Sequence, residues 1–181
     1  MIRAASVFSV VASTSLALAL GACSAPKDSR IGVLVPNEST FPPVADLLAY
    51  RCGSLDCHGS SQRNFVIWSC YGLRLDPNAI PGCDGKANHT SPGEYDRTFR
   101  SLVGLEPAVM SGVVASNGAN PDELTLVRKA RGEEAHKGGT LFVPGDVQDQ
   151  CVAQWLSNSS ATATTCASAL SLDESTDAGA R

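Results

Sequence analysis

Two cysteines and a histidine lie together in one short stretch of this chain, residues 51–59, which read RCGSLDCHG. The concentration is notable because the whole chain holds only three histidines among its 181 residues. Four residues separate Cys52 from Cys57, and His58 follows the second thiol directly. Any interpretation of the fold and of the function depends on what these three side chains hold.

The chemistry that this pattern suggests is covalent haem attachment. Two thiols can add to the two vinyl groups of a haem while an adjacent histidine reaches the iron, and the usual form is C-x-x-C-H. Here the spacing is C-x-x-x-x-C-H, so the two extra residues form a bulged loop that can still present both sulfurs to one porphyrin edge. The alternative is a disulfide between Cys52 and Cys57 beside a histidine with no special role.

The first 22 residues have the pattern of an export signal. They contain one positive charge, Arg3, then an apolar run over 4–20 without any charged residue, and they end on Leu-Gly-Ala before Cys23. This ending resembles a bacterial lipobox, in which the cysteine becomes the lipidated first residue of the mature protein. We therefore predict a signal peptide over 1–22, lipidation of Cys23 and a flexible tether over 23–40. An ordinary secretory signal with a leftover cysteine is the alternative.

Export would place the remaining cysteines where disulfides persist, so they are expected to be bonded or ligated. With Cys23 assigned to lipid, six remain. If Cys52 and Cys57 carry haem, the others divide into two local pairs, Cys70 with Cys83 and Cys151 with Cys166. Each would close a short loop worth about 3 kcal/mol in the chain-entropy model. Three disulfides would satisfy the same count.

The residues between 41 and 156 predict one mainly helical domain. Prolines at 42 and 43 and an apolar face after them predict a helix leading into Cys52. Two β-prone runs over 64–75 predict a small hairpin. The capping box that starts at Ser91 predicts a helix ending near Gly104.

The second half of that domain is expected to hold an irregular, partly buried connection and two further helices. The connection covers 105–119, and a short helix after Pro121 is stopped by Gly132. Asp146 can cap a final helix that carries Trp155. From 157 to 181 the Ser, Thr and Ala bias predicts a disordered tail.

Taken in order, these elements resemble a cytochrome-c-type domain, specifically the cytochrome-c-like modules of exported bacterial proteins. A helix enters the cysteine-histidine segment, and a Pro-x-x-Leu element (Pro121 and Leu124), a His-Lys-Gly-Gly loop over 136–139 and a terminal helix with Trp155 follow in matching order. The resemblance covers roughly residues 41–156.

The resemblance implies a role for each residue of the motif. Cys52 and Cys57 would form thioethers to haem c, His58 would be the proximal iron ligand, and His136 would be the sixth ligand. Met110 competes for the sixth position, although a thioether in an apolar stretch is more often core packing. His89 is expected at the surface.

The leading hypothesis is therefore an electron-transfer module with one covalent haem, anchored by lipid in the bacterial cell envelope, at the periplasm or the outer membrane, and serving an unidentified redox partner. Without the signal the net charge is −5, which argues against nucleic-acid binding. Zinc needs four well-placed ligands, which adjacent Cys57 and His58 do not readily supply. No nucleophile-elbow or phosphate-loop motif indicates an enzyme. The alternative function is a haem-free, disulfide-stapled envelope lipoprotein with a binding or structural role.

Overall fold

The computed structural model describes residues 32–76, 78 and 90–179, with side chains described as far as Asp173 in the last helix. Residues 33–181 form the folded unit that carries the motif. The predicted signal peptide, most of the predicted tether with Cys23, and the positions of Cys83 and His89 lie outside the described residues.

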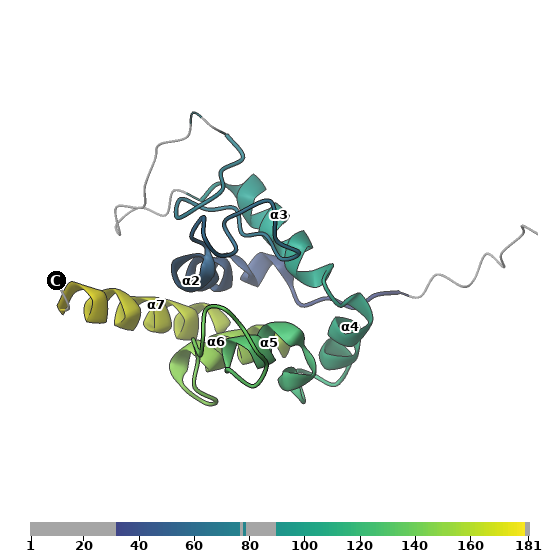
Figure 1. The fold of residues 1–181 in the computed structure, drawn as a ribbon. Helices are drawn as coiled ribbons and strands as arrows, with labels where there is room; N and C mark the ends of the chain where they lie inside the picture. The colour runs from purple at the N-terminus through teal and green to yellow at the C-terminus, as the bar shows by residue number, and fades with distance from the viewer. Residues whose placement is uncertain (1–31, 77, 79–89, 180–181) are drawn as a thin grey trace, which may run out of the picture. The chain divides into compact units, whose positions relative to one another are not determined.

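The folded unit is mainly helical, as predicted (Figure 1). No helix among the described residues is long and apolar enough to cross a bilayer. The elements in chain order are η1 (Glu38–Thr40), α2 (Pro42–Cys52), α3 (Pro92–Val103), α4 (Pro107–Ala115), η2 (Pro121–Glu123), α5 (Thr125–Ala130), α6 (Val147–Leu156) and α7 (Thr162–Gly179).

Three of these helices begin where the sequence predicted. α2 starts with two prolines, whose fixed φ suits the first turn, and runs into Cys52. α3 has the full capping box, in which the Ser91 side chain accepts from the Glu94 N–H and the Glu94 carboxylate accepts from the Ser91 N–H. α6 is capped by Asp146, whose side chain accepts from the Asp149 N–H.

An aromatic group at the centre of the unit joins these helices. The Phe41 ring lies 5.4 Å from that of Phe99 and 5.0 Å from that of Trp155, measured between ring centroids. Trp155 is fully buried, and its indole N–H donates to the backbone carbonyl of Asn37 at 3.3 Å. The folded unit therefore begins before the predicted start of the domain, because Leu34 and Asn37 of the predicted tether are already hydrogen-bonded to the rest of it.

The predicted hairpin over 64–75 is not confirmed. The described part of the chain contains one isolated bridge, between Trp68 and Leu73, and no strand. Backbone N–H groups of this segment find other acceptors: Val66 donates to the Ser101 hydroxyl at 2.8 Å and Trp68 to the Thr98 hydroxyl at 3.0 Å. Two hydroxyls on α3 thus take the bonds that a partner strand would have accepted.

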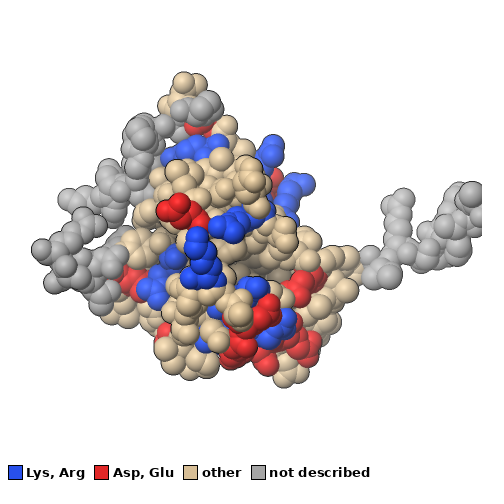
Figure 2. Space-filling view, viewed as in Figure 1, with Lys and Arg blue, Asp and Glu red and all other residues tan. Residues whose placement is uncertain are grey.

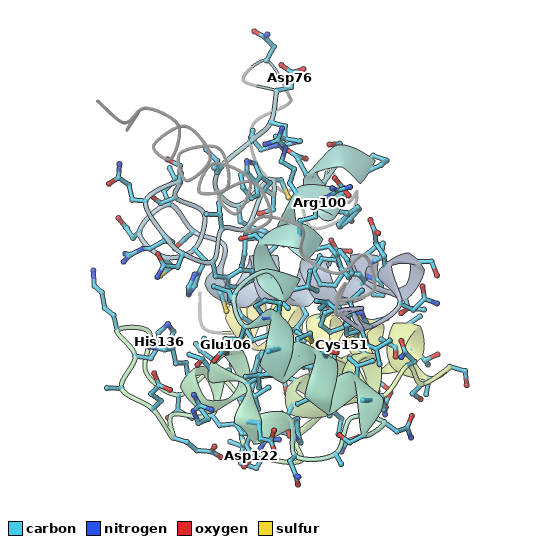
Figure 3. The ribbon with its side chains drawn as sticks, turned by 90° about the vertical axis from the view of Figure 1, so that its right-hand side faces the viewer. Asp76, Arg100, Glu106, Asp122, His136 and Cys151 are labelled. Atoms are coloured by element: carbon cyan, nitrogen blue, oxygen red, sulfur yellow. A yellow bond between two sulfur atoms is a disulfide. The ribbon has the colours of Figure 1, made fainter. Side chains whose placement is uncertain are left out.

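The expectation of an irregular connection over 105–119 was wrong, because residues 107–115 form α4. Pro107 occupies its first turn, and Met110 and Val113 point into the core at a helical spacing of three. The other positions of this helix are small or apolar and carry no charge, which obscures the periodicity that marks the buried face. Glu106, labelled in Figure 3, fixes the α4 start to α5 by accepting from both the N–H and the hydroxyl of Thr125.

The expectation of a disordered tail was also wrong, since residues 162–179 form α7, which packs against α6 and α2. The predicted disulfide between Cys151 and Cys166 is present and joins α6 to α7. Asp173 on α7 accepts from Gln148 at 2.7 Å and pairs with Arg51 of α2 at 3.5 Å. Composition favoured disorder, but a covalent link and a buried carboxylate supply the stability that small side chains do not.

Candidate functional site

A cavity of about 400 Å³ lies between the cysteine-histidine segment and the region from α5 to residue 141. Its volume falls within the range of about 300–1,000 Å³ that is usual for small-molecule and cofactor sites. Its apolar wall includes Leu48, Phe65, Leu105, Leu126, Ala130 and Leu141. Cys52, Cys57, His58 and His136 all line this cavity, so the structure brings together the four side chains that the sequence assigned to one cofactor.

The two extra residues between the cysteines form a closed turn. The N–H groups of Cys57 and Gly59 both donate to the Ser54 carbonyl at 2.9 Å, and the His58 N–H donates to the Cys52 carbonyl at 2.9 Å. Arg63 donates to the carbonyls of Asp56 and Cys57 at 2.9 and 3.0 Å. The wider spacing is thus absorbed in a hydrogen-bonded loop, and both sulfurs remain at the same cavity.

Three glycines, Gly53, Gly59 and Gly72, allow this loop to pack closely against the segment around residue 72. A Cβ added to Gly59 would lie 2.0 Å from the Gly53 carbonyl oxygen, and one added to Gly72 would lie 2.2 Å from the same atom. Backbone meets backbone at these positions, so no side chain could move aside to make room. Glycine is therefore required at position 59, immediately after His58, and at position 72, because the chain passes close to the Gly53 carbonyl at both places.

His58 is oriented by a backbone carbonyl. Its Nδ1 lies 2.9 Å from the Phe65 carbonyl oxygen, which fixes the tautomer with the proton on Nδ1 and leaves the Nε2 lone pair available. Burial lowers the pKa of His58, a shift opposed by the Phe65 hydrogen bond and reinforced by the nearby positive charges of Arg63 and Lys129. The imidazole is consequently neutral at neutral pH, the form that binds a metal.

The two motif cysteines are free thiols in this structure and are not joined to each other. Cys52 is buried at the end of α2, while Cys57 is half-buried. Burial raises the pKa of the Cys52 thiol to about 12, with the neighbouring Arg51 opposing the shift and Cys57 adding to it. Cys52 therefore stays protonated at neutral pH and presents a neutral S–H to the cavity.

His136 faces His58 across the cavity from the loop that follows α5, at the edge of the unit in Figure 3. The two ring centroids are 5.9 Å apart and the ring planes differ by 25°. Two imidazoles on opposite sides of one metal, each with a metal–nitrogen bond of about 2 Å, place their ring centres roughly 6 Å apart. The distance between the two ring centroids therefore matches that of two imidazoles bound on opposite sides of one metal ion.

The remaining predicted site residues lie elsewhere. Met110, the competing sixth ligand, is buried in the core on α4 and does not line the cavity. Cys70 is disulfide-bonded, and its predicted partner Cys83 is outside the described residues, as is Cys23. The sequence did not indicate the Phe65 carbonyl, because any residue supplies a carbonyl. Nor did it indicate Arg51, whose guanidinium bonds to the Leu141 carbonyl and so ties α2 to the far wall of the cavity.

The donor set of the site fits a haem better than a bare metal ion. The described part of the chain contains no group of three or more His, Cys, Asp or Glu side chains placed to hold a metal. A haem iron needs only two protein ligands, because the porphyrin supplies the other four. His136 strengthens the fit, since its buried Nδ1 has no hydrogen-bond partner among the described residues.

Comparison of the chain with protein-family models, with curated proteins and with solved structures found no match. The functional argument therefore depends on the residues of the cavity themselves.

Proposed function

We propose that this protein is a lipid-anchored c-type cytochrome module that binds one covalent haem and transfers electrons in the bacterial cell envelope. The observation that carries the proposal is the arrangement of two imidazoles 5.9 Å apart across an apolar cavity with two free thiols in its wall. A role as a disulfide-stapled protein does not account for two free thiols, a fixed imidazole tautomer and an opposed second imidazole at one cavity.

Each motif side chain has a distinct role in this proposal. The S–H groups of Cys52 and Cys57 would hold the haem by adding across its two vinyl groups, each sulfur bonding to one vinyl carbon and its hydrogen going to the other, without any net oxidation. His58, held by the Phe65 carbonyl, and His136 would each supply one nitrogen to the iron. Arg63, Lys129 and Lys137 line the same cavity and are the candidate partners of the haem carboxylates.

The bound haem would supply iron that cycles between two oxidation states. The chain's own contribution is to set the potential: two imidazole ligands give a lower potential than an imidazole and a thioether, and the apolar wall limits access of water. The exposed approach to the cavity near Lys137 leaves a route for electrons to a partner protein.

The deciding experiment is expression of the full chain in cells whose haem-attachment machinery is active. The expected product absorbs visible light and yields a peptide over residues 52–58 that carries the mass of haem on both cysteines. A double variant with serine at 52 and 57 is the matched control and should be colourless. A colourless wild-type protein with Cys52 and Cys57 joined would refute the proposal and favour the haem-free, disulfide-stapled lipoprotein.

The anchor is tested separately. Cys23→Ser should release the mature protein from the membrane fraction, because a lipid chain on this residue is the proposed membrane attachment. Membrane association that survives the substitution would contradict lipidation of Cys23 without affecting the haem proposal.

A further inference from the structure

The two histidines of the cavity are supported very differently. His58 has its Nδ1 bonded to the Phe65 carbonyl at 2.9 Å, and its backbone carbonyl accepts from the Ile67 N–H at 2.8 Å. Within the described residues, the structure gives neither ring nitrogen of His136 a hydrogen bond, although Nδ1 is buried. Metal-ligating histidines almost always donate their second ring nitrogen to an acceptor, which fixes the ring and strengthens the bond. His136 lacks that support.

The loop that carries His136 is held by backbone bonds at its start, where the Glu133 N–H donates to the Arg128 carbonyl at 2.8 Å, and by ion pairs at the surface. Glu134 pairs with Arg128 and with Lys129 at 3.1 Å each, and all three side chains are more than a third exposed. Exposed pairs of this kind contribute little and are screened by salt. The loop begins at Gly132 and ends at Gly139, both at positive φ, so its two ends already use conformations that glycine adopts freely.

From this asymmetry we infer that His136 is an exchangeable iron ligand, and that its departure opens a binding site for a small neutral diatomic molecule on the side of the haem opposite His58. The inference depends on the proposed haem and deepens it: the same cavity would bind a ligand as well as pass electrons. His58 is the permanent ligand, because releasing it would break a buried hydrogen bond as well as the metal bond.

The exchange involves no change of oxidation state. The imidazole of His136 leaves with its lone pair, and the diatomic molecule brings a lone pair of its own, so one coordinate bond breaks as another forms. The proton on the imidazole stays where it is. The movement required is confined to the loop over 132–139, since α5 and α6 on either side are held by the core.

One glycine offers a way to shift the exchange without removing the ligand. A Cβ added to Gly138 would lie 2.9 Å from His136 Cε1 and 3.2 Å from its Nδ1, so Gly138→Ala should push the ring out of place. Gly112 is the matched control, because a Cβ there meets nothing within 4 Å. Both changes add one methyl group to a non-strained glycine.

The probe is carbon monoxide, added to haem-loaded protein that has been reduced with dithionite. We expect the wild type to form the carbon monoxide complex at a rate that levels off with concentration, because release of His136 limits it. His136→Ala should react in proportion to concentration. Gly138→Ala should raise the limiting rate at least about tenfold, the equivalent of about 1.4 kcal/mol, and Gly112→Ala should match the wild type.

Each other outcome contradicts the inference. No complex with the wild type, while His136→Ala reacts, would show that His136 is a permanent ligand. A His136→Ala spectrum identical to that of the wild type would show that it is not a ligand at all. A limiting rate in Gly138→Ala equal to that of the wild type would remove the loop from the exchange. These results all require attached haem, so they are distinct from failure of the proposed function, in which no haem spectrum appears.

Discussion

The two walls of the cavity hold their histidines by different means. The motif wall, residues 52–75, is held by backbone contacts: a turn closed on Ser54, three glycines in contact, and a carbonyl bonded to the His58 ring. The loop wall, residues 132–139, has backbone bonds at its start and otherwise depends on ion pairs at the surface, where acidic and basic side chains lie intermixed over α5 and the loop (Figure 2). One cavity thus combines a firmly held histidine with a more loosely held one.

This difference shows where the site can tolerate change. Interactions between buried backbone groups are costly to break, because the groups left behind have no water to bond. The charged groups of an exposed ion pair, in contrast, are readily solvated by water or screened by salt ions when the pair separates. Substitutions and conditions should therefore affect the two walls unequally, and four predictions follow from that inequality in order of expected size.

The largest effect is expected from the ligands themselves. His58→Ala should abolish the spectrum of a six-coordinate haem and sharply reduce the yield of haem-loaded protein, because it removes both the fixed ligand and its Phe65 bond. His136→Ala should keep covalent haem and lose only the sixth ligand. Absorption spectra and the mass of the intact proteins measure both. Equal yields of loaded protein from the two variants would refute a difference between the walls.

The second-largest effect is expected from a methyl group added where Gly59 contacts the Gly53 carbonyl. Gly59→Ala should destabilise the protein by about 1–3 kcal/mol or more, the usual cost of overpacking, because its Cβ would overlap the Gly53 carbonyl. Gly93→Ala is the control, since a Cβ there meets only a leucine methyl group at 3.4 Å. Urea unfolding of both variants gives the comparison. A Gly59→Ala protein as stable as the control would mean that the motif wall is not tightly packed.

Acid should destabilise the motif wall, because it protonates the Glu94 carboxylate, which accepts hydrogen bonds from Arg74 and Leu75. Burial raises the pKa of this carboxyl, but hydrogen bonds from Ser91, Arg74 and Leu75 outweigh it, so the pKa lies below its ordinary value of 4.5. The stabilisation is therefore complete above pH 4.5 and is lost as the pH falls through the lowered pKa. Unfolding free energy measured from pH 6 to pH 3 should drop accordingly.

The matched variants for the acid experiment are Glu94→Gln and Asp96→Asn. Glu94→Gln should be less stable at pH 7 and should depend less on pH over the same range, because no carboxyl remains to protonate at this buried position. Asp96 pairs with Arg100 at the surface, so Asp96→Asn should leave the slope nearly unchanged. Identical slopes for wild type and Glu94→Gln would remove Glu94 as the cause.

The smallest effect is expected from salt. Raising the ionic strength from about 0.1 M to about 1 M shortens the screening length from about 10 Å to about 3 Å. The pairs of Glu134 with Arg128 and Lys129 should weaken, and hydrogen exchange at the amides of residues 132–139 should accelerate severalfold. The Ile67 amide, bonded to the His58 carbonyl, is the internal control and should not change. Acceleration at both places would mean that salt loosens the whole domain.

Helices with explicit start signals were predictable from the sequence. The prolines before α2, the capping box of α3 and Asp146 before α6 each satisfy otherwise free N–H groups or fix φ locally, so short-range chemistry determines where these helices begin. α4 and α7 were not predicted, because their formation depends on packing and, for α7, on the disulfide between Cys151 and Cys166. Local composition does not indicate which distant residues a segment will pack against or be bonded to.

The site was predictable to the extent that its chemistry lies in side chains. Cys52, Cys57, His58 and His136 were singled out and all line one cavity. The sequence favoured His136 over Met110 as the sixth ligand, but only the fold shows that the segment of His136, and not that of Met110, lies at the cavity opposite His58. The sequence could not identify the Phe65 carbonyl or the three-glycine contact, since both arise only when the backbone folds back on itself.

The packing of α7 on α2 has a consequence for the order of assembly. α7 comes much later in the chain than Cys52, so in the proposed export from the amino end the motif would emerge before the helix that packs on α2. An attachment enzyme could then meet both thiols before α7 packs on the helix that carries Cys52. The Cys151–Cys166 disulfide, which joins two helices late in the chain, would form last and hold α7 on α6.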